Sequence, residues 1–317
     1  YQIIAFNSDN RSQLFSATDE GNVHRISVNK DGSLLVSGGY ANKNIRIYNA
    51  NNLQVVSTIK DFSSVDDLCF SPINNHFAVV GALPNNKQAI VIYNADNRGK
   101  VRNIFVQGGG KALPTCLTYS PDGKYLAAGF ANESTGIYIY DAETGDQIRY
   151  ISHSSDITAL EFSPDGQYIA GGGIDNNVNI WTVSTGVLVK TLKGLDNYIL
   201  TLDYSPDGAY IVAAGMDHTC VFKMWNVSTG SLVQSMDQKG PDINALRFSP
   251  DGQSLAVALR TYGDLFEVTT TAIYKTGDGV SSSSWYEVAS SKADLRLEFP
   301  VKPEEASSGD QYYGYYD

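Results

Sequence analysis

Residues 159–172 read ALEFSPDGQYIAGG, and this stretch decides the fold. An apolar segment that ends in Phe162 runs into the turn Ser163-Pro164-Asp165-Gly166, and a second apolar segment then runs into small residues. The same turn recurs at Ser120, Ser205 and Ser249, and looser copies begin at Asn29 and Ser71. The six starts are 42, 49, 43, 42 and 44 residues apart, a period that is typical of propeller blades and longer than that of shorter solenoid repeats. The repeat therefore predicts an all-β fold.

Each copy predicts four short strands. In the copy that begins at Ser163, Asp165-Gly166 supplies a tight turn between two alternating apolar segments. Two further turns, at residues 175–177 and 185–186, separate the expected third and fourth strands. The four strands are expected at residues 157–162, 168–171, 178–181 and 187–192. Four antiparallel strands make one twisted sheet, and a radial ring of such sheets protects the edges that would otherwise pair with other chains.

The ends of the third strands carry the resemblance to a known family. They read Tyr48-Asn49, Tyr93-Asn94, Tyr140-Asp141, Trp181-Thr182 and Trp225-Asn226. Over nearly its whole length the chain resembles the WD-repeat β-propeller family, whose signature dipeptide is Trp-Asp at that strand end. The resemblance implies a scaffold that holds other proteins on its faces inside the cell, and it says little about any activity.

The chain departs from that family in the polar side chains of its blades. The family's blades often share a hydrogen-bonded set of His, Ser or Thr, Asp and Trp, and only the fourth copy approaches it, with His153, Asp175 and Trp181. The other copies place these residues where the His would stand: Asp19, Asp61, Gly110, Leu195 and Lys239. We therefore expect the blades to depend more on packing than on that network.

The two ends of the chain predict a further blade. Residues 3–7 align with the third strand at 45–49, and residues 295–299 match the first strand at 158–162. We expect one domain over residues 1–317 with seven blades, six of them full repeats and the seventh shared between residues 1–17 and about 293–317. The alternative is six blades followed by a tail.

Composition and spacing argue against several classes of function. A net charge of −11 without any run of Lys or Arg argues against nucleic-acid binding, which needs a clustered basic face. No apolar stretch reaches the ~18 residues that a membrane-spanning helix needs. The three cysteines, Cys69, Cys116 and Cys220, lack partners at metal-ligand spacing and are expected to be buried thiols. The glycine-rich residues 107–111 lack the frame of a phosphate-binding loop. We therefore expect a non-enzymatic protein without metal or cofactor.

One position in each copy, just after the second strand, is expected near the mouth of the central channel. Tyr, Met and Arg are enriched at interfaces, and an apolar patch with a polar rim is typical of docking surfaces. The predicted partner-binding residues are Tyr40, Ile174, Met216 and Arg260 at this position, together with Phe130, which immediately precedes it in its copy. The alternative is that these side chains fill the channel or seal neighbouring blades.

The C-terminal end motivates a second hypothesis. Residues 300–317 form an acidic arm with four tyrosines suited to an interface, Tyr312, Tyr313, Tyr315 and Tyr316. The arm packs either on its own chain or on a neighbouring copy. A charged fraction of 18%, below the roughly 25% of average domains, with abundant Asn, Ser and Tyr, favours a secreted or cell-surface protein. An arm that binds a complementary patch on a neighbouring copy makes head-to-tail contacts, which grow into rings or filaments. If the chain is secreted, Asn10, Asn132 and Asn226 are candidate N-glycosylation sites. The location thus stays open between cytoplasm and cell surface.

Overall fold

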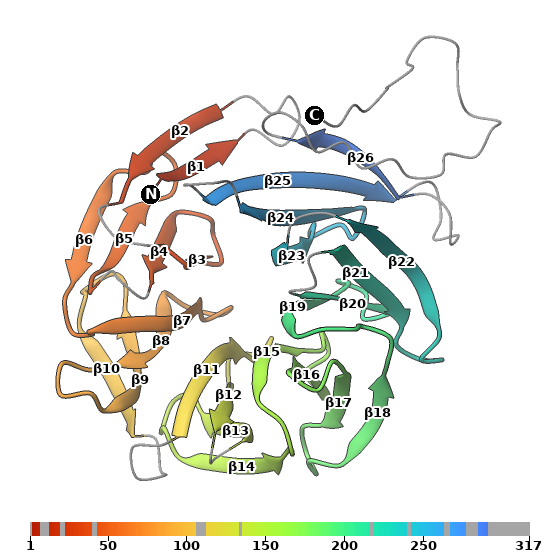
Figure 1. Cartoon of the computed structure of the whole chain (residues 1–317). Helices are drawn as coiled ribbons and strands as arrows, with labels where there is room; N and C mark the ends of the chain where they lie inside the picture. The colour runs from red at the N-terminus through yellow and green to blue at the C-terminus, as the bar shows by residue number, and fades with distance from the viewer. Residues whose placement is uncertain are drawn as a thin grey trace. The chain divides into compact units, whose positions relative to one another are not determined.

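The computed structural model describes residues 2–6, 13–19, 23–39, 43–105, 112–132, 135–215, 219–239, 242–262, 267–276 and 285–290. Within these ranges every regular element is a β-strand (Figure 1). The chain divides into two compact units, residues 1–169 with 182–187 and residues 170–181 with 188–317. The sheets in both are antiparallel, as predicted for an all-β chain.

In the part of the chain that the structure describes, the first unit holds one two-stranded sheet and three four-stranded sheets. The two-stranded sheet pairs β1 (Gln2–Phe6) with β2 (Gln13–Thr18). The four-stranded sheets follow chain order and consist of β3 (Arg25–Val28), β4 (Leu34–Gly38), β5 (Ile45–Asn49) and β6 (Val55–Ile59); β7 (Ser64–Phe70), β8 (His76–Ala82), β9 (Gln88–Asn94) and β10 (Lys100–Phe105); and β11 (Ala112–Tyr119), β12 (Tyr125–Asn132), β13 (Gly136–Asp141) and β14 (Gln147–Ser152).

Three more sheets repeat this order. The first contributes residues to both units and comprises β15 (Ile157–Phe162), β16 (Tyr168–Gly173), β17 (Val178–Thr182) and β18 (Leu188–Leu192). The second unit holds β19 (Ile199–Tyr204), β20 (Tyr210–Gly215), β21 (Thr219–Asn226) and β22 (Leu232–Lys239), and then β23 (Asp242–Phe248), β24 (Ser254–Tyr262), β25 (Glu267–Thr276) and β26 (Trp285–Ser290). The strands predicted around Ser163 are confirmed to within two residues at each end.

The Ser-Pro-Asp-Gly turn is held by its own side chains. The Ser163 hydroxyl donates to Asp165 Oδ1 at 2.5 Å and accepts the Tyr168 N–H at 3.0 Å. Asp165 Oδ1 also accepts the Gln167 N–H at 2.9 Å, and Gly166 has φ +70°, a conformation that favours glycine. The copies at Ser120, Ser205 and Ser249 repeat these contacts. The repeated aspartates are therefore turn residues, as expected.

The first strands β7, β11, β19 and β23 each carry a bulge that the sequence did not reveal. The register of β7 against β8 shifts at Asp66, and that of β11 against β12 shifts at Thr115. In the second unit the same shift occurs at Leu200 in β19 and Asn244 in β23. Each of these residues stands five positions before its turn. A bulge re-aims a side chain and ends regular pairing, and bulges often lie near functional sites.

The small residues of the second strand make room for the next sheet. A β-carbon built on Gly129 would lie 2.6 Å from Ile157 Cγ2, and one on Gly38 would lie 2.7 Å from Val65 Cγ1. In the second unit, Gly172 stands in the same way against Ile199. Because no side chain fits there, the glycines let a branched residue of the following copy pack against the strand.

Side chains of the first strands hydrogen-bond the backbone of the next first strand. Ser27 Oγ accepts the N–H of Phe70 at 3.0 Å. In the second unit, Asp203 Oδ2 accepts the N–H of Phe248 at 2.7 Å from the same two positions of the repeat. These bonds satisfy amide groups that would otherwise be unpaired, so they link successive sheets within each unit.

Cationic side chains link the outer strands in a similar way. Arg149 in β14 donates to the carbonyl oxygens of Ser184 and Thr185. Lys190 in β18 donates to the carbonyl oxygens of Val227 and Ser228 at 2.7 and 2.6 Å. An inward-pointing charge on an outer strand also discourages pairing with other chains.

The expectation that the polar network is largely missing needs correction in the first two copies. The Asp19 carboxylate is 1% exposed and accepts hydrogen bonds from Tyr48 Oη at 2.7 Å and Ser37 Oγ at 3.2 Å, and it pairs with Arg46. Burial and the Asp19 charge raise the pKa of Tyr48. In the next copy Asp61 accepts from Tyr93 Oη at 2.8 Å. An Asp–Tyr pair therefore stands where the family has His and Trp.

Among the described residues, the sheet β1–β2 has two strands where the others have four. Ile3 packs in a small core with Leu35, Tyr48 and Leu53. The strands predicted to complete this blade fall at residues 293–317, outside the described residues, so the count of seven blades stays a prediction.

Candidate binding surface

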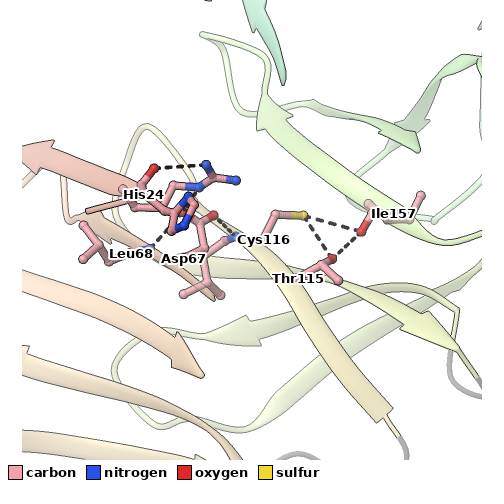
Figure 2. A network of polar contacts seen from close by, with 8 residues as sticks. His24, Asp67, Leu68, Thr115, Cys116 and Ile157 are labelled. Carbon is pink, nitrogen blue, oxygen red and sulfur yellow. Dashed lines mark hydrogen bonds and ion pairs between the residues drawn. The ribbon is translucent and has the colours of Figure 1, made fainter. Parts of the chain in front are cut away.

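A polar network joins the first strands β3, β7, β11 and β15 (Figure 2). Asp67 Oδ1 accepts the Arg25 Nε–H at 3.1 Å and its neighbour Leu68 N–H at 2.9 Å, and Oδ2 accepts the Leu117 N–H at 2.8 Å. Thr115 and Cys116 both donate to the carbonyl oxygen of Ile157. Both carboxylate oxygens of Asp67 thus accept hydrogen bonds from within the fold. The network therefore serves to hold the strands together.

Asp66 lies beside this network, at the bulge of β7. No described residue donates a hydrogen bond to its carboxylate. Partial burial, followed by the neighbouring Asp67 charge, raises its pKa to about 6, while Arg25 acts in the opposite direction. A perturbed carboxylate at a bulge is a candidate functional group, and the alternative is a purely structural group perturbed by burial and its neighbours.

Phe130 lies in the core rather than on a surface. Its side chain is 1% exposed, packs with Ile90, Ile104 and Leu117, and meets the ring of Tyr138 with centroids 4.6 Å apart. A partner cannot contact this ring without opening the sheet. The alternative prediction for these residues is that their side chains fill the channel or seal neighbouring blades. The buried, apolar surroundings of Phe130 agree with a sealing role.

Ile174 is exposed, as a partner-binding residue must be. Its side chain is 44% exposed and follows β16 directly. The turn beneath it is held by the Asn176 N–H to Gly173 O bond at 3.3 Å and by Asn177 Nδ2 to Asp175 O at 2.8 Å. A large apolar side chain is thus presented on an anchored turn.

The other predicted residues are only partly described. Tyr40, Met216, the four tyrosines of residues 300–317 and Asn10 lie outside the described residues, as do residues 107–111. Arg260 lies in β24, opposite Asp242, and the structure describes its backbone alone. Asn132 is exposed with φ +65°, and its N–H donates to Asp156 at 2.9 Å. Asn226 is half-buried, and its Oδ1 accepts from the Thr229 N–H at 2.9 Å. Glycan attachment at these sites stays a prediction.

Tyr198 is an exposed aromatic that the sequence reasoning missed. It is 47% exposed and precedes β19 directly. Its backbone lies against Gly215. Its place in the repeat could have pointed to it, because it is an aromatic residue seven positions before the turn at Ser205. The corresponding residues of the copies at Ser71, Ser120 and Ser163 are not aromatic: Ser64, Leu113 and Asp156.

Among the described residues, no three His, Cys, Asp or Glu side chains lie close enough together to hold a metal ion. The thiols of Cys69 and Cys116 are free, and burial, the largest cause, raises the pKa of both, to about 12 for Cys116. Such thiols are weak nucleophiles. Within the described ranges there is also no helix with the length and apolar character to cross a membrane.

Comparison with known proteins gives matches over separate parts of the chain. The family model "WD domain, G-beta repeat" matches residues 4–49 and 186–222. The model "Eukaryotic translation initiation factor eIF2A" matches residues 58–197. An uncharacterized WD repeat-containing protein of Schizosaccharomyces pombe is 28% identical over 134 residues, which is 42% of this chain. The match spans only 21% of that relative's length. Together with the repeat and the four-stranded antiparallel sheets, these matches support a WD-repeat family for this chain.

Proposed function

We propose that the chain is a non-enzymatic scaffold that binds other proteins through the loops that follow its second strands. WD repeats in general support a role in protein interaction. The observation that carries the proposal is Ile174, an exposed apolar side chain on an anchored turn at a position that recurs in every copy. Rigid presentation lowers the entropy lost on binding.

A quantitative co-purification tests this function. The affinity-tagged chain, its Ile174→Asp variant and a Val189→Asp control are isolated from cells, and the bound proteins are compared by mass spectrometry. Val189 is similarly exposed, at 48%, but lies in β18. We expect a set of proteins to be lost with Ile174→Asp and kept with Val189→Asp. If every bound protein stays at its wild-type amount with Ile174→Asp, this position is not a docking site.

The match of residues 58–197 to the eIF2A family supports a second candidate. In it the scaffold serves translation initiation, where its partners would be proteins of the initiation machinery. Sucrose-gradient sedimentation of cell extracts tests it: the tagged chain is expected to travel with small ribosomal subunits. A chain that stays at the top of the gradient under crosslinking conditions contradicts this candidate.

The self-assembling surface subunit stays a separate prediction, because the arm at residues 300–317 lies outside the described residues. Light scattering and intact mass of material from its native source, with and without that arm, decide it. Polymers and attached sugars are expected under this hypothesis, whereas a monomer of bare sequence mass rules it out.

A further inference from the structure

The loop that leads into β19 is held by contacts along most of its length. Trp225 Nε1 donates to the carbonyl oxygen of Lys193 at 3.3 Å, and Lys223 Nζ donates to that of Gly194. Leu195 is buried. Asn197 Oδ1 accepts the N–H of Tyr198 at 2.8 Å. The loop therefore presents the exposed Tyr198 ring from a backbone that is tied to the sheet beneath it.

The turn that carries Ile174 lies beside this loop. A β-carbon on Gly172 would stand 2.8 Å from Ile199 Cδ1, so the end of β16 packs on the start of β19. Ile174 stands two residues after Gly172, and Tyr198 stands one residue before Ile199. Both side chains are nearly half exposed. The two loops thus expose an aliphatic and an aromatic side chain at neighbouring strand ends of the second unit.

An exposed carboxylate stands in the same loop. Asp196 is exposed and forms no ion pair with any residue that the structure describes. The cations nearest in sequence are Lys193, which is exposed, and Lys190, whose ammonium group is bound to the carbonyl oxygens of Val227 and Ser228. The ammonium group of Lys223 is bound to the loop backbone at Gly194. The chain as a whole carries a net charge of −11, so the surface favours an approaching cation.

From these residues we propose that Tyr198, Asp196 and Ile174 form a docking site for an arginine side chain of a partner protein. A guanidinium group stacks on an aromatic face and pairs with a carboxylate, and its aliphatic stem packs on apolar surface. Tyr198 supplies the ring, Asp196 the carboxylate and Ile174 the apolar contact. The site rests on the proposed scaffold function and specifies the chemistry of the segment that it binds.

Peptide selection on the whole chain tests this site. A phage-displayed library of random 12-residue peptides is selected on the wild-type chain, and the enriched peptides are synthesised and measured by fluorescence polarisation. We expect enriched peptides to contain arginine, and replacement of that arginine by alanine to abolish binding. Tyr198→Ala and Asp196→Asn should each weaken binding about three- to tenfold. Asp196→Asn should also flatten the salt dependence.

Matched controls keep the test specific. Ile174→Ser, which removes the apolar contact, should also weaken binding. Tyr150→Ala removes a tyrosine of similar exposure from β14, and Val189→Ser in β18 is the control for Ile174→Ser; neither control should change binding. Circular dichroism confirms that each variant folds. Selection without arginine enrichment, or enriched peptides that bind the Tyr198 and Asp196 variants as tightly as wild type, overturns the site. The proposed scaffold function is tested independently by the co-purification. It is contradicted if Ile174→Asp loses none of the proteins that bind the wild-type chain.

Discussion

The buried carboxylate of Asp19 shows how one residue can replace a family feature. In this copy of the repeat, Asp19 faces Tyr48, Ser37 and Arg46, so its charge is compensated and its oxygens are bonded. The pattern was visible in the sequence as an aspartate at the position of the family's histidine. Its partners were not, because they come from strands 18 to 29 residues away.

Asp19→Asn is predicted to destabilise the chain. The substitution leaves the Arg46 guanidinium, whose side chain is 11% exposed, without its counter-charge. Breaking a buried pair in this way costs about 3–5 kcal/mol. The measurement is the urea midpoint, with Asp196→Asn as an exposed control that should stay within about 0.5 kcal/mol. An unchanged midpoint for Asp19→Asn would show that the pair contributes nothing to folding.

Asp66 gives a prediction about pH. Its folded pKa of about 6 lies above the ordinary value of 3.8, so between pH 4 and 6 the unfolded chain loses the proton first and stability falls as pH rises. Below pH 4 both states are protonated and the group has no effect. Asp66→Asn should therefore stabilise the chain at pH 7.5, by about 1 kcal/mol after solvent screening is allowed for, and leave it nearly unchanged at pH 4.

Thermal unfolding of Asp66→Asn at both pH values measures this difference, with Glu143→Gln as an exposed control. An equal effect of Asp66→Asn at pH 4 and pH 7.5 would mean that the carboxylate charge is not the cause.

At the scale of the strands, glycine positions show how tightly the sheets are built. In β8, a β-carbon on Gly81 would overlap the backbone carbonyl oxygen of Ser64 in β7. A backbone atom within a paired sheet cannot move aside as a side chain can. The strand pair was predictable from the alternating pattern, whereas the close approach depends on the bulge at Asp66.

Gly81→Ala is predicted to lower stability by about 1–3 kcal/mol or more, because the added methyl group overpacks the pair. The sign is informative, since Gly→Ala at an unstrained site usually stabilises a protein by restricting the unfolded chain. Gly99→Ala is the control, because its nearest neighbour is the flexible end of the Asn97 side chain. Chemical denaturation compares the two variants. Equal denaturation midpoints for Gly81→Ala and Gly99→Ala would mean that β7 and β8 move apart to accommodate the methyl group without loss of stability.

For the whole molecule, the incomplete sheet is the feature that matters most. Within the described residues β1 pairs with β2 alone, and an open strand edge invites pairing. We predict that deletion of residues 293–317 lowers the denaturation midpoint, because it removes the segment expected to supply the first strand of this blade. Deletion of residues 300–317, which keeps 295–299, should cost less. If both truncations unfold at the wild-type midpoint, the six-blade alternative with a tail is favoured.

By itself the sequence determined the strands, their turns and the family. These depend on contacts between near neighbours along the chain: the alternation of apolar residues, and the Asp-Gly turns closed by their own Ser and Asp side chains. The tertiary structure alone decided which of the candidate positions are exposed. Phe130 and Ile174 occupy adjacent positions of the repeat, yet one is buried and the other exposed. It also decided that Tyr198 lies on an anchored loop beside Ile174. The physical reason is that burial, the bulges and the Asp–Tyr pairs depend on what a distant strand places against each residue.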